Sequence, residues 1–244
     1  MKTAIFLFLC LSVFLAGCQN NKSAGKPEIL LVTGGHNFDT AEFFNVFDSF
    51  DQYDFTRKSQ PEANEYMGSE EIGKYSIIIF YDMWDKITEE QKKYYTNITM
   101  NGTGLLFLHH SLVSYQEWDE FRNIIGGKYI QEGSVDDSSK FSGYRHDIEL
   151  EVNIIDPEHP VTSGIENFKI TDEGYSNFIV EKNVKPLLST KHPDSGEIIG
   201  WTHKFNNSGI VYLMLGHDSK AYSNENFRKL IGNSIQYLSK KDER

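Results

Sequence analysis

The chain has 244 residues, 24 basic and 35 acidic side chains, a formal net charge of −11 at pH 7 and an aromatic content of 14%. The acidic excess excludes non-specific attraction to nucleic acid or to anionic lipid headgroups, and it favours neutral or cationic small ligands. The length suffices for one well-buried α/β domain, and no shift in composition marks a second. We expect a single domain over residues 28–240, no nucleic-acid partner, and an oligomeric state that the sequence leaves open.

The first 17 residues combine a basic start at Lys2, an apolar run and small residues at the end. This pattern is typical of a secretion signal, and the run is too short to be a stable membrane anchor by itself. Leu15-Ala16-Gly17-Cys18 resembles the lipobox of bacterial lipoproteins, which implies cleavage before Cys18 and acylation of that residue, as with palmitate. Residues 18–27 then form the lipidated cysteine and a flexible tether. We therefore expect a lipid-anchored protein of the cell envelope that faces the periplasm.

The only cysteines, Cys10 and Cys18, both lie in this amino-terminal segment. After cleavage at the lipobox, the globular part contains no thiol. Disulfides, cysteine nucleophiles and thiolate metal sites are therefore excluded from the domain.

The domain opens with an apolar, β-branched stretch over residues 28–35 that ends in a glycine pair before His36. A strand that runs into glycines and then a helix is the opening of a doubly wound fold. The loop lacks the glycine patterns that hold nucleotides, so no nucleotide is expected. The sequence next predicts a helix over 40–50, a short strand over 51–57 and a loop or irregular helix over 60–71.

Two further strands are predicted to be buried on both faces. Residues 75–82 end at Asp82, shortly before Trp84, and both are candidate ligand contacts. A capping box of Thr88 and Gln91 starts a helix over 88–100. The stretch 102–111, GTGLLFLHHS, is an apolar run that stops abruptly at two histidines, and a helix over 115–125 follows. This alternation predicts a mostly parallel sheet with helices on both faces.

The rhythm changes in the C-terminal half. Residues 128–143 are polar and predict a long functional loop, and residues 146–154 alternate as a half-exposed antiparallel strand does. Turn residues occupy 158–165, and the segment 168–179 contains Asp172-Glu173-Gly174-Tyr175, a candidate site wall. Three more strands are predicted over 184–190, 197–205 and 209–215, the last two as a hairpin, and a final amphipathic helix over 224–238.

Several buried strands therefore end in histidine. His36 follows the first, His109 and His110 follow the strand at 104–108, and His217 with Asp218 follows the last. Because the carboxyl ends of parallel strands meet at one edge of a sheet, we expect these side chains to form a site. His109 and His217 are the predicted central acid–base pair, with His110 and Asp218 orienting them.

The same imidazoles suit a divalent, zinc-like metal, with His36, His109 and His217 as candidate ligands, although no HExxH spacing supports it. Metal-free acid–base chemistry remains open beside it. A serine nucleophile at Ser111 lacks the GxSxG context. The residues expected to contact substrate are His36, Asp82, Trp84, Asp172, Glu173 and Tyr175, with Trp84 or Tyr175 stacking on a sugar ring.

A family resemblance rests on motifs spread over residues 28–238. They are LLVTGGHNFD, IIIFYD, GLLFLHHS, WxxFxxIIGG, HPVTSGI, DEGY, LGHD and FRKLIGNSIQYL. In order and spacing they resemble the trehalose-utilisation, or ThuA-like, family. The resemblance implies a flavodoxin-like fold similar to class I glutamine amidotransferases, and a role in catabolism of disaccharides or 3-keto sugars.

In those amidotransferases the nucleophilic cysteine occupies the turn after a central strand, whereas here that turn carries His109. Glutaminase chemistry is therefore excluded. The expected function is action on a disaccharide or keto-sugar by histidine-based or metal-assisted chemistry, as an isomerase, a lyase or a metal-assisted hydrolase. The alternative is a non-catalytic sugar-binding lipoprotein.

Overall fold

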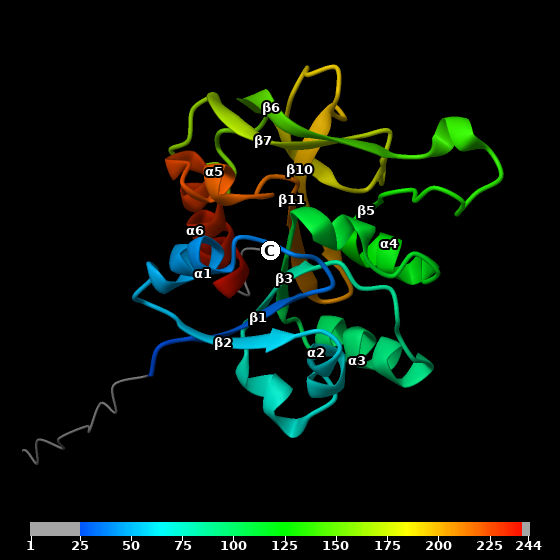
Figure 1. Ribbon diagram of the computed structural model, residues 1–244. Helices are drawn as coiled ribbons and strands as arrows, with labels where there is room; N and C mark the ends of the chain where they lie inside the picture. Colours follow the sequence, from blue (N-terminus) through cyan, green and yellow to red (C-terminus); the bar gives the residue numbers. More distant parts are fainter. Residues whose placement is uncertain (1–24, 241–244) are drawn as a thin grey trace, which may run out of the picture.

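The computed structural model describes residues 25–240 (Figure 1). The predicted signal peptide and Cys18 lie outside the described residues. Among the residues that are described, no helix is both long and apolar enough to cross a membrane.

Strands and helices alternate along the first half of the chain, and strands dominate the second. The strands are β1 (Glu28–Gly34), β2 (Asp54–Ser59), β3 (Ile77–Asp82), β4 (Gly104–Leu108), β5 (Gly127–Lys128), β6 (Gly143–Ile154), β7 (Phe168–Ser176), β8 (Ile179–Val180), β9 (Lys185–Ser189), β10 (Ile198–Phe205) and β11 (Ser208–Leu213). The α-helices are α1 (Thr40–Asp48), α2 (Glu62–Tyr66), α3 (Glu89–Met100), α4 (Asp119–Ile125), α5 (Ser219–Tyr222) and α6 (Glu225–Ser239). Short 3₁₀ turns are η1 (Glu70–Lys74), η2 (His109–Val113) and η3 (Ser138–Lys140).

A nine-stranded sheet with the order β2-β1-β3-β4-β11-β10-β9-β6-β7 runs through the molecule. Strands β2, β1, β3, β4 and β11 pair in parallel. Every residue of β3 and β4 is buried, as continuous apolar runs require when helices cover both faces. The α/β fold with a parallel core, predicted from these runs, is confirmed.

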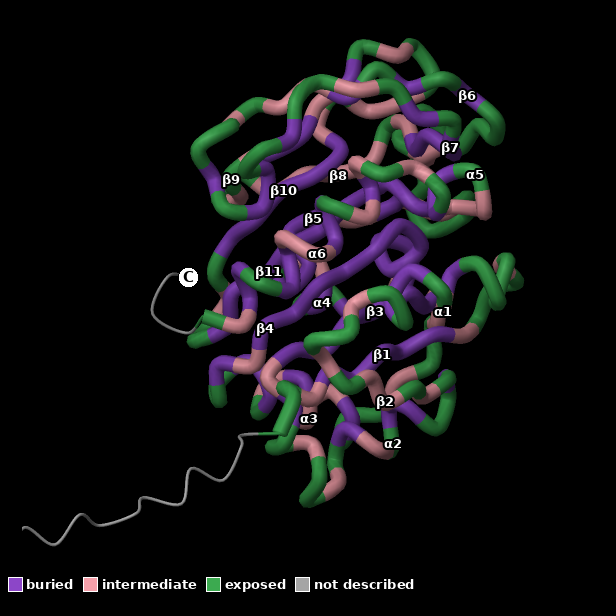
Figure 2. Tube along the Cα trace, turned by 90° about the vertical axis from the view of Figure 1, so that its left-hand side faces the viewer, coloured by how far each residue is buried: buried purple, intermediate pink, exposed green. Residues whose placement is uncertain are grey.

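Helices cover both faces of the parallel strands. Figure 1 shows α1 and α6 on one side of β1, β3 and β11, with α3 and α4 on the other. Helix α6 packs on β3, β4 and β11 through its apolar stripe, which includes Leu230, Ile231 and Ile235. In Figure 2 the buried residues follow β1, β3, β4 and β11 through the centre of the molecule, while exposed residues are frequent in β6 and in the connecting loops.

The other half of the sheet is antiparallel, as the alternating C-terminal pattern predicts. Strands β10 and β11 form the expected hairpin, with Asn206 in the left-handed region at a φ of 52°. The pairing of β6 with β7 is interrupted between Arg145 and Ile148, where Asp147 has a φ of 57°. This β-bulge changes the direction of the side chains around it.

Several predicted element boundaries differ from those observed. Strand β2 spans Asp54–Ser59 rather than residues 51–57, and β6 begins at Gly143 rather than at residue 146. Helix α4 begins at Asp119 rather than at residue 115, because the chain first forms η2 and then places Tyr115 in the left-handed region, at a φ of 52°. The segment over 60–71 contains helix α2 and the start of η1, and within the long loop after α4 a short strand, β5, pairs with β8.

Candidate functional site

The parallel strands β1, β3, β4 and β11 end at one edge of the sheet, and the turns that follow them carry the predicted site residues. After β1, Gly35 has a φ of 84°, and a Cβ there would lie 1.7 Å from the carbonyl oxygen of Met83. Only glycine permits this close approach, which brings His36 over the strand ends. The ring of His36 stacks on that of His110, with 4.1 Å between centroids.

His109 is the first residue after β4 and is fully buried in a left-handed turn, with a φ of 40°. Its Nδ1 donates a hydrogen bond to the carbonyl oxygen of Met214, and Tyr175 stacks on its ring with 4.7 Å between centroids. Because a carbonyl oxygen can only accept, the Nδ1 atom carries the proton, and in the neutral ring Nε2 presents a lone pair. The fold therefore fixes both the orientation and the tautomer of His109.

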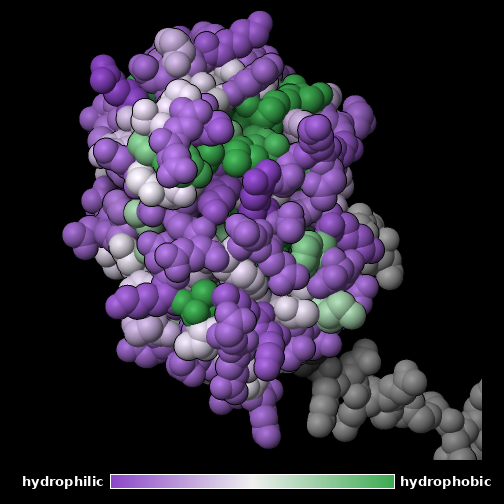
Figure 3. Space-filling view, turned by 90° about the vertical axis from the view of Figure 1, so that its right-hand side faces the viewer, coloured by the Kyte–Doolittle hydropathy of each residue, from purple (hydrophilic) through white to green (hydrophobic). Residues whose placement is uncertain are grey.

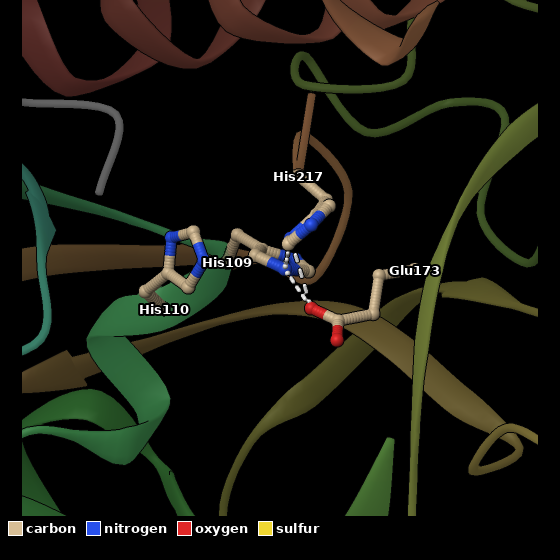
Figure 4. Close-up of side chains that lie close together, drawn as sticks. All are labelled: His109, His110, Glu173 and His217. Atoms are coloured by element: carbon tan, nitrogen blue, oxygen red, sulfur yellow. Dashed lines mark hydrogen bonds and ion pairs between the residues drawn. The ribbon is translucent and has the colours of Figure 1, made fainter. Parts of the chain in front are cut away.

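Glu173 on β7 faces this lone pair. Its Oε2 lies 2.8 Å from His109 Nε2 and 2.9 Å from His217 Nδ1, and the two histidine nitrogens lie 3.2 Å apart (Figure 4). Burial raises the pKa of Glu173, but the contacts in which it shares a proton with His109 and His217 outweigh this effect and hold the pKa below its usual value. Burial lowers the pKa of His217, and the bond to Glu173 outweighs that effect and raises it. Electron pairs from three groups thus converge on one point, which requires a proton or a cation.

Asp172 holds the turn that carries His217. Its carboxylate accepts hydrogen bonds from the backbone N–H groups of Gly216 at 2.7 Å, His217 at 2.9 Å and Glu173 at 2.8 Å. A Cβ on Gly216, whose φ is 108°, would lie 2.6 Å from the ring of Phe227. Asp172 is therefore a positioning residue behind the cluster rather than a ligand contact.

His110 completes the cluster. Its side chain is buried, and neither ring nitrogen is bonded to any group in the described part of the chain. Burial, and then the neighbouring histidines, lower its pKa well below the usual value, so the ring is neutral at pH 7. A buried imidazole with two unpaired nitrogens costs free energy unless a ligand takes one of them.

Four side chains offer ligand atoms that all lie within 4.8 Å of one another, namely those of His109, His110, Glu173 and His217. Nitrogen and carboxylate donors of this kind suit zinc-like cations. The bond from His109 Nδ1 to a backbone carbonyl is the outer contact that metal-bound histidines usually make. His36 lies beside this set, with its Nδ1 2.5 Å from the carbonyl oxygen of Asn37. The structure therefore gives His109, His110, Glu173 and His217 as the candidate ligand set. The sequence analysis had predicted His36 with His109 and His217, without His110 or Glu173.

A pocket of about 720 Å³ opens above the cluster. The predicted functional loop contributes Tyr129, Gln131 and Glu132 to its wall. Two of its lining residues, His146 and Tyr144 on β6, were not predicted. The Nδ1 of His146 lies 3.4 Å from Glu173 Oε1, and Tyr144 is 62% exposed. The bulge in β6 directs His146 to the site, and nothing in the alternating pattern of that strand indicates a bulge.

Six predicted site residues do not line this pocket, namely His109, His217, Asp172, Asp82, Trp84 and Asp218. The first three belong to the cluster or support it, and the other three lie elsewhere. The carboxylate of Asp82 is buried, where it accepts hydrogen bonds from Gln60 at 2.9 Å and Ser111 at 3.4 Å. Trp84 lines a neighbouring groove. Asp218 caps helix α5 by accepting from the backbone N–H groups of residues 220 and 221.

Residues 29–238 match the ThuA family, which is described as trehalose utilisation. The chain belongs to the ThuA family. No curated protein matches it significantly. Among solved structures, this ThuA-family chain is similar to a ThuA-like protein from Parabacteroides merdae, with a TM-score of 0.71, 19% identity, and 88% of this chain and 90% of that chain covered.

A ThuA-like protein from Bacteroides uniformis has a TM-score of 0.64 at 18% identity, with 90% and 94% of the two chains covered. A glutamine amidotransferase from Thermotoga maritima has a TM-score of 0.52 at 9% identity, with 88% of this chain and 99% of that chain covered. At these identities the likeness shows a shared fold, which is the amidotransferase-like fold expected from the sequence, and fold alone does not carry the chemistry across.

Proposed function

We propose that this ThuA-family protein acts on a disaccharide or 3-keto sugar at the histidine pocket, by metal-assisted chemistry. The observation that carries the proposal is the convergence of His109, His110, Glu173 and His217, whose ligand atoms lie within 4.8 Å of one another. Membership of a family described as trehalose utilisation supports the substrate class.

The residues present fit a divalent, zinc-like cation. Glu173 supplies a charge that burial makes costly without a positive partner, and His110 supplies a neutral nitrogen that lacks any partner among the described residues. A cation bound by these groups supplies Lewis-acid polarisation of a sugar carbonyl or hydroxyl oxygen.

Two histidines line the pocket without belonging to the ligand set. His36 stacks on His110, and His146 is half exposed beside Glu173. We assign these two to proton transfer, because a 3-keto sugar has an acidified C–H next to its carbonyl and its isomerisation or lysis needs a base there. Tyr144, exposed in the same pocket, stacks on the sugar ring.

Metal-free acid–base chemistry uses the same groups differently. His109, Glu173 and His217 then share a proton, and His109 with His217 becomes the acid–base pair. Turnover that survives exhaustive chelation favours this mechanism, whereas turnover that chelation removes and added zinc restores favours the metal.

Anchoring in the cell envelope through a lipid on Cys18 is also part of the proposal, and it is supported by the lipobox-like sequence at residues 15–18. Incorporation of labelled palmitate into the wild-type protein, and its loss in Cys18→Ser, tests this point.

The test of the proposed function is turnover of trehalose and of its 3-keto derivative, followed by NMR with the purified protein. We expect His109→Ala, His217→Ala and Glu173→Gln to lose at least about 10²-fold in kcat/KM. His192→Ala is the control, because His192 offers no atom to the ligand set and does not line the pocket.

Full turnover by the His109→Ala and His217→Ala variants would overturn the proposed site. Tight binding of an unmodified sugar by the wild-type protein, with no product formed, would instead support the non-catalytic sugar-binding alternative.

A further inference from the structure

A second hollow lies directly beside the histidine pocket. It is a groove of about 1510 Å³, and Gln131 and Glu132 line both the groove and the pocket. Pockets for a single drug-sized ligand measure about 300–1,000 Å³, so the groove has room for more than one sugar ring. It lies between the start of α3, the start of α4 and the segment after β5.

Trp84 is the aromatic side chain of the groove that is neither buried nor fully exposed. Its backbone is fixed on both sides, because its N–H donates to Ser114 Oγ at 3.0 Å and its carbonyl accepts from Tyr115 N–H at 2.9 Å. Tyr115 makes this bond from the left-handed region, a conformation that residues with a side chain rarely adopt. The fold therefore fixes the backbone that carries this indole at the wall of the groove.

Five acidic and four basic side chains line the groove, and three of the basic ones, all except Lys86, form ion pairs in the described part of the chain. Lys92 pairs with Glu89 at 2.6 Å, Arg122 pairs with Glu181, and Lys128 lies 4.0 Å from Asp119. Three further carboxylates of the lining have no ion-pair partner in residues 25–240, namely those of Asp85, Glu117 and Glu132. A lining of carboxylates, amides and an aromatic ring suits the hydroxyl groups and the apolar face of a neutral saccharide.

The wall shared with the histidine pocket is held in place at its base. Ile130 N–H donates to Ser142 Oγ at 2.9 Å, and Asn177 donates to the carbonyls of Ser139 at 3.0 Å and Phe141 at 2.8 Å. Figure 3 views the side of the molecule where α4 and this segment lie, and the surface there is mainly hydrophilic, with its largest apolar area in the upper half. The pocket and the groove thus form neighbouring hollows that share the wall made by Gln131 and Glu132.

We propose that the substrate is a neutral saccharide longer than its reacting unit, and that the groove binds the further rings with Trp84 as their stacking platform. This inference rests on the proposed function, because it assumes that the reacting ring occupies the histidine pocket. In this arrangement Tyr144 stacks on the reacting sugar ring in the histidine pocket. Trp84 stacks on the further rings, which lie in the groove on the other side of Gln131 and Glu132.

The test measures affinity against chain length by calorimetry with the purified full chain. The probes are glucose, maltose, maltotriose and maltotetraose, and the matching series from cellobiose upward. We expect the trisaccharide of at least one series to bind at least about tenfold tighter than glucose, as stacking on an additional aromatic ring provides.

Two substitutions distinguish the contribution of Trp84 in the groove from that of Tyr144 in the histidine pocket. Trp84→Ala removes the gain with chain length, so that the ratio of the glucose and trisaccharide dissociation constants falls below about twofold. Tyr144→Ala weakens glucose and the longer probes by the same factor. Met100→Ala, at an exposed residue of α3 that lines neither cavity, is the control for a change in surface area.

A wild-type protein that binds glucose and every longer probe equally overturns the inference while leaving the proposed function standing. A Trp84→Ala variant that keeps the full gain with length overturns it as well. A wild-type protein that binds none of these saccharides overturns the inference, whereas the turnover assay with trehalose and its 3-keto derivative decides the proposed function separately.

Discussion

Among the residues of the histidine site, His110 has the side chain that should lower the stability of the folded protein most. A buried polar group without a hydrogen bond costs about 1–3 kcal/mol, and both nitrogens of this ring lack a partner in the described part of the chain. Buried polar side chains that lack a hydrogen bond, and so destabilise the fold, are expected mainly at functional sites. The position of His110 is therefore best explained by a ligand.

Replacement of His110 by leucine separates its effect on folding stability from its effect on zinc binding. We expect His110→Leu to raise the free energy of unfolding of the metal-free protein by about 1–2 kcal/mol, because an apolar side chain removes the unpaired nitrogens. The same variant loses zinc affinity. Urea unfolding in the presence of a chelator measures the first effect, and zinc titration measures the second.

The control is His203→Leu. The Nε2 of His203 donates to the carbonyl oxygen of Ile124 at 3.0 Å, so its loss should lower the free energy of unfolding. Destabilisation of the metal-free protein by His110→Leu, to the extent seen for His203→Leu, would count against the ligand role of His110.

Asp82 makes a second prediction at the residue scale. Burial raises its pKa to about 7, and the hydrogen bond from Gln60 only partly opposes this. An unfolded aspartate has a pKa near 4, so between about pH 4 and pH 7 the native state binds more protons than the unfolded state. The contribution of Asp82 to stability therefore falls as the pH rises through this window.

In Asp82→Asn this contribution is absent. We expect the difference in free energy of unfolding, variant minus wild type, to increase with pH from 4.5 to 7 by at most about 1.4 kcal/mol per pH unit, and to level off above pH 7. Chemical unfolding of both proteins at several pH values measures it. A difference that does not change with pH would show that the carboxyl group titrates normally.

At the scale of elements, the site joins the parallel strands to an antiparallel strand from the far edge of the sheet. Strand β7 is the last strand in the sheet order, yet Asp172 and Glu173 on it reach the turn after β11. The string Asp172-Glu173-Gly174-Tyr175 could be selected from sequence as a site wall. The separate roles of Asp172, which holds the turn at Gly216, and of Glu173, which faces the histidines, could not be predicted from sequence. These contacts depend on how the antiparallel half of the sheet curves over the strand ends.

Asp172→Asn tests this junction. An amide has one acceptor oxygen where the carboxylate has two, and the bonds to Gly216 and His217 use different oxygens. We expect the free energy of unfolding to fall by about 1–3 kcal/mol. Zinc affinity should fall about 10–100-fold, as for other residues that orient metal ligands. Unfolding curves and zinc titrations measure these effects, and an unchanged zinc affinity would show that Asp172 does not position His217.

At the scale of the whole molecule, the predictable part of the fold is the part with continuous apolar strands. β1, β3 and β4 could be predicted because burial on both faces leaves an unbroken apolar run, as in the IIIFYD stretch of β3. Their histidines could then be placed at one edge by topology alone. His146 and Tyr144 could not, because a β-bulge in β6 decides their direction and a bulge leaves no regular mark on the sequence.

The amidotransferase-like fold and the site chemistry are separate properties of this molecule. The turn after β4 has the strained backbone of a nucleophile turn, with His109 at a φ of 40°, but its side chain is an imidazole that faces Glu173 and His217. The same architecture thus presents imidazoles and a carboxylate at this turn, and we propose that they bind a cation.

The metal content of the purified protein tests the central claim most directly. After incubation with zinc and dialysis, elemental analysis should find about one ion per chain in the wild-type protein and in His192→Ala. It should find none in Glu173→Gln or His110→Leu. A wild-type protein that retains no divalent cation, or a Glu173→Gln variant that retains as much as the wild type, would contradict the account.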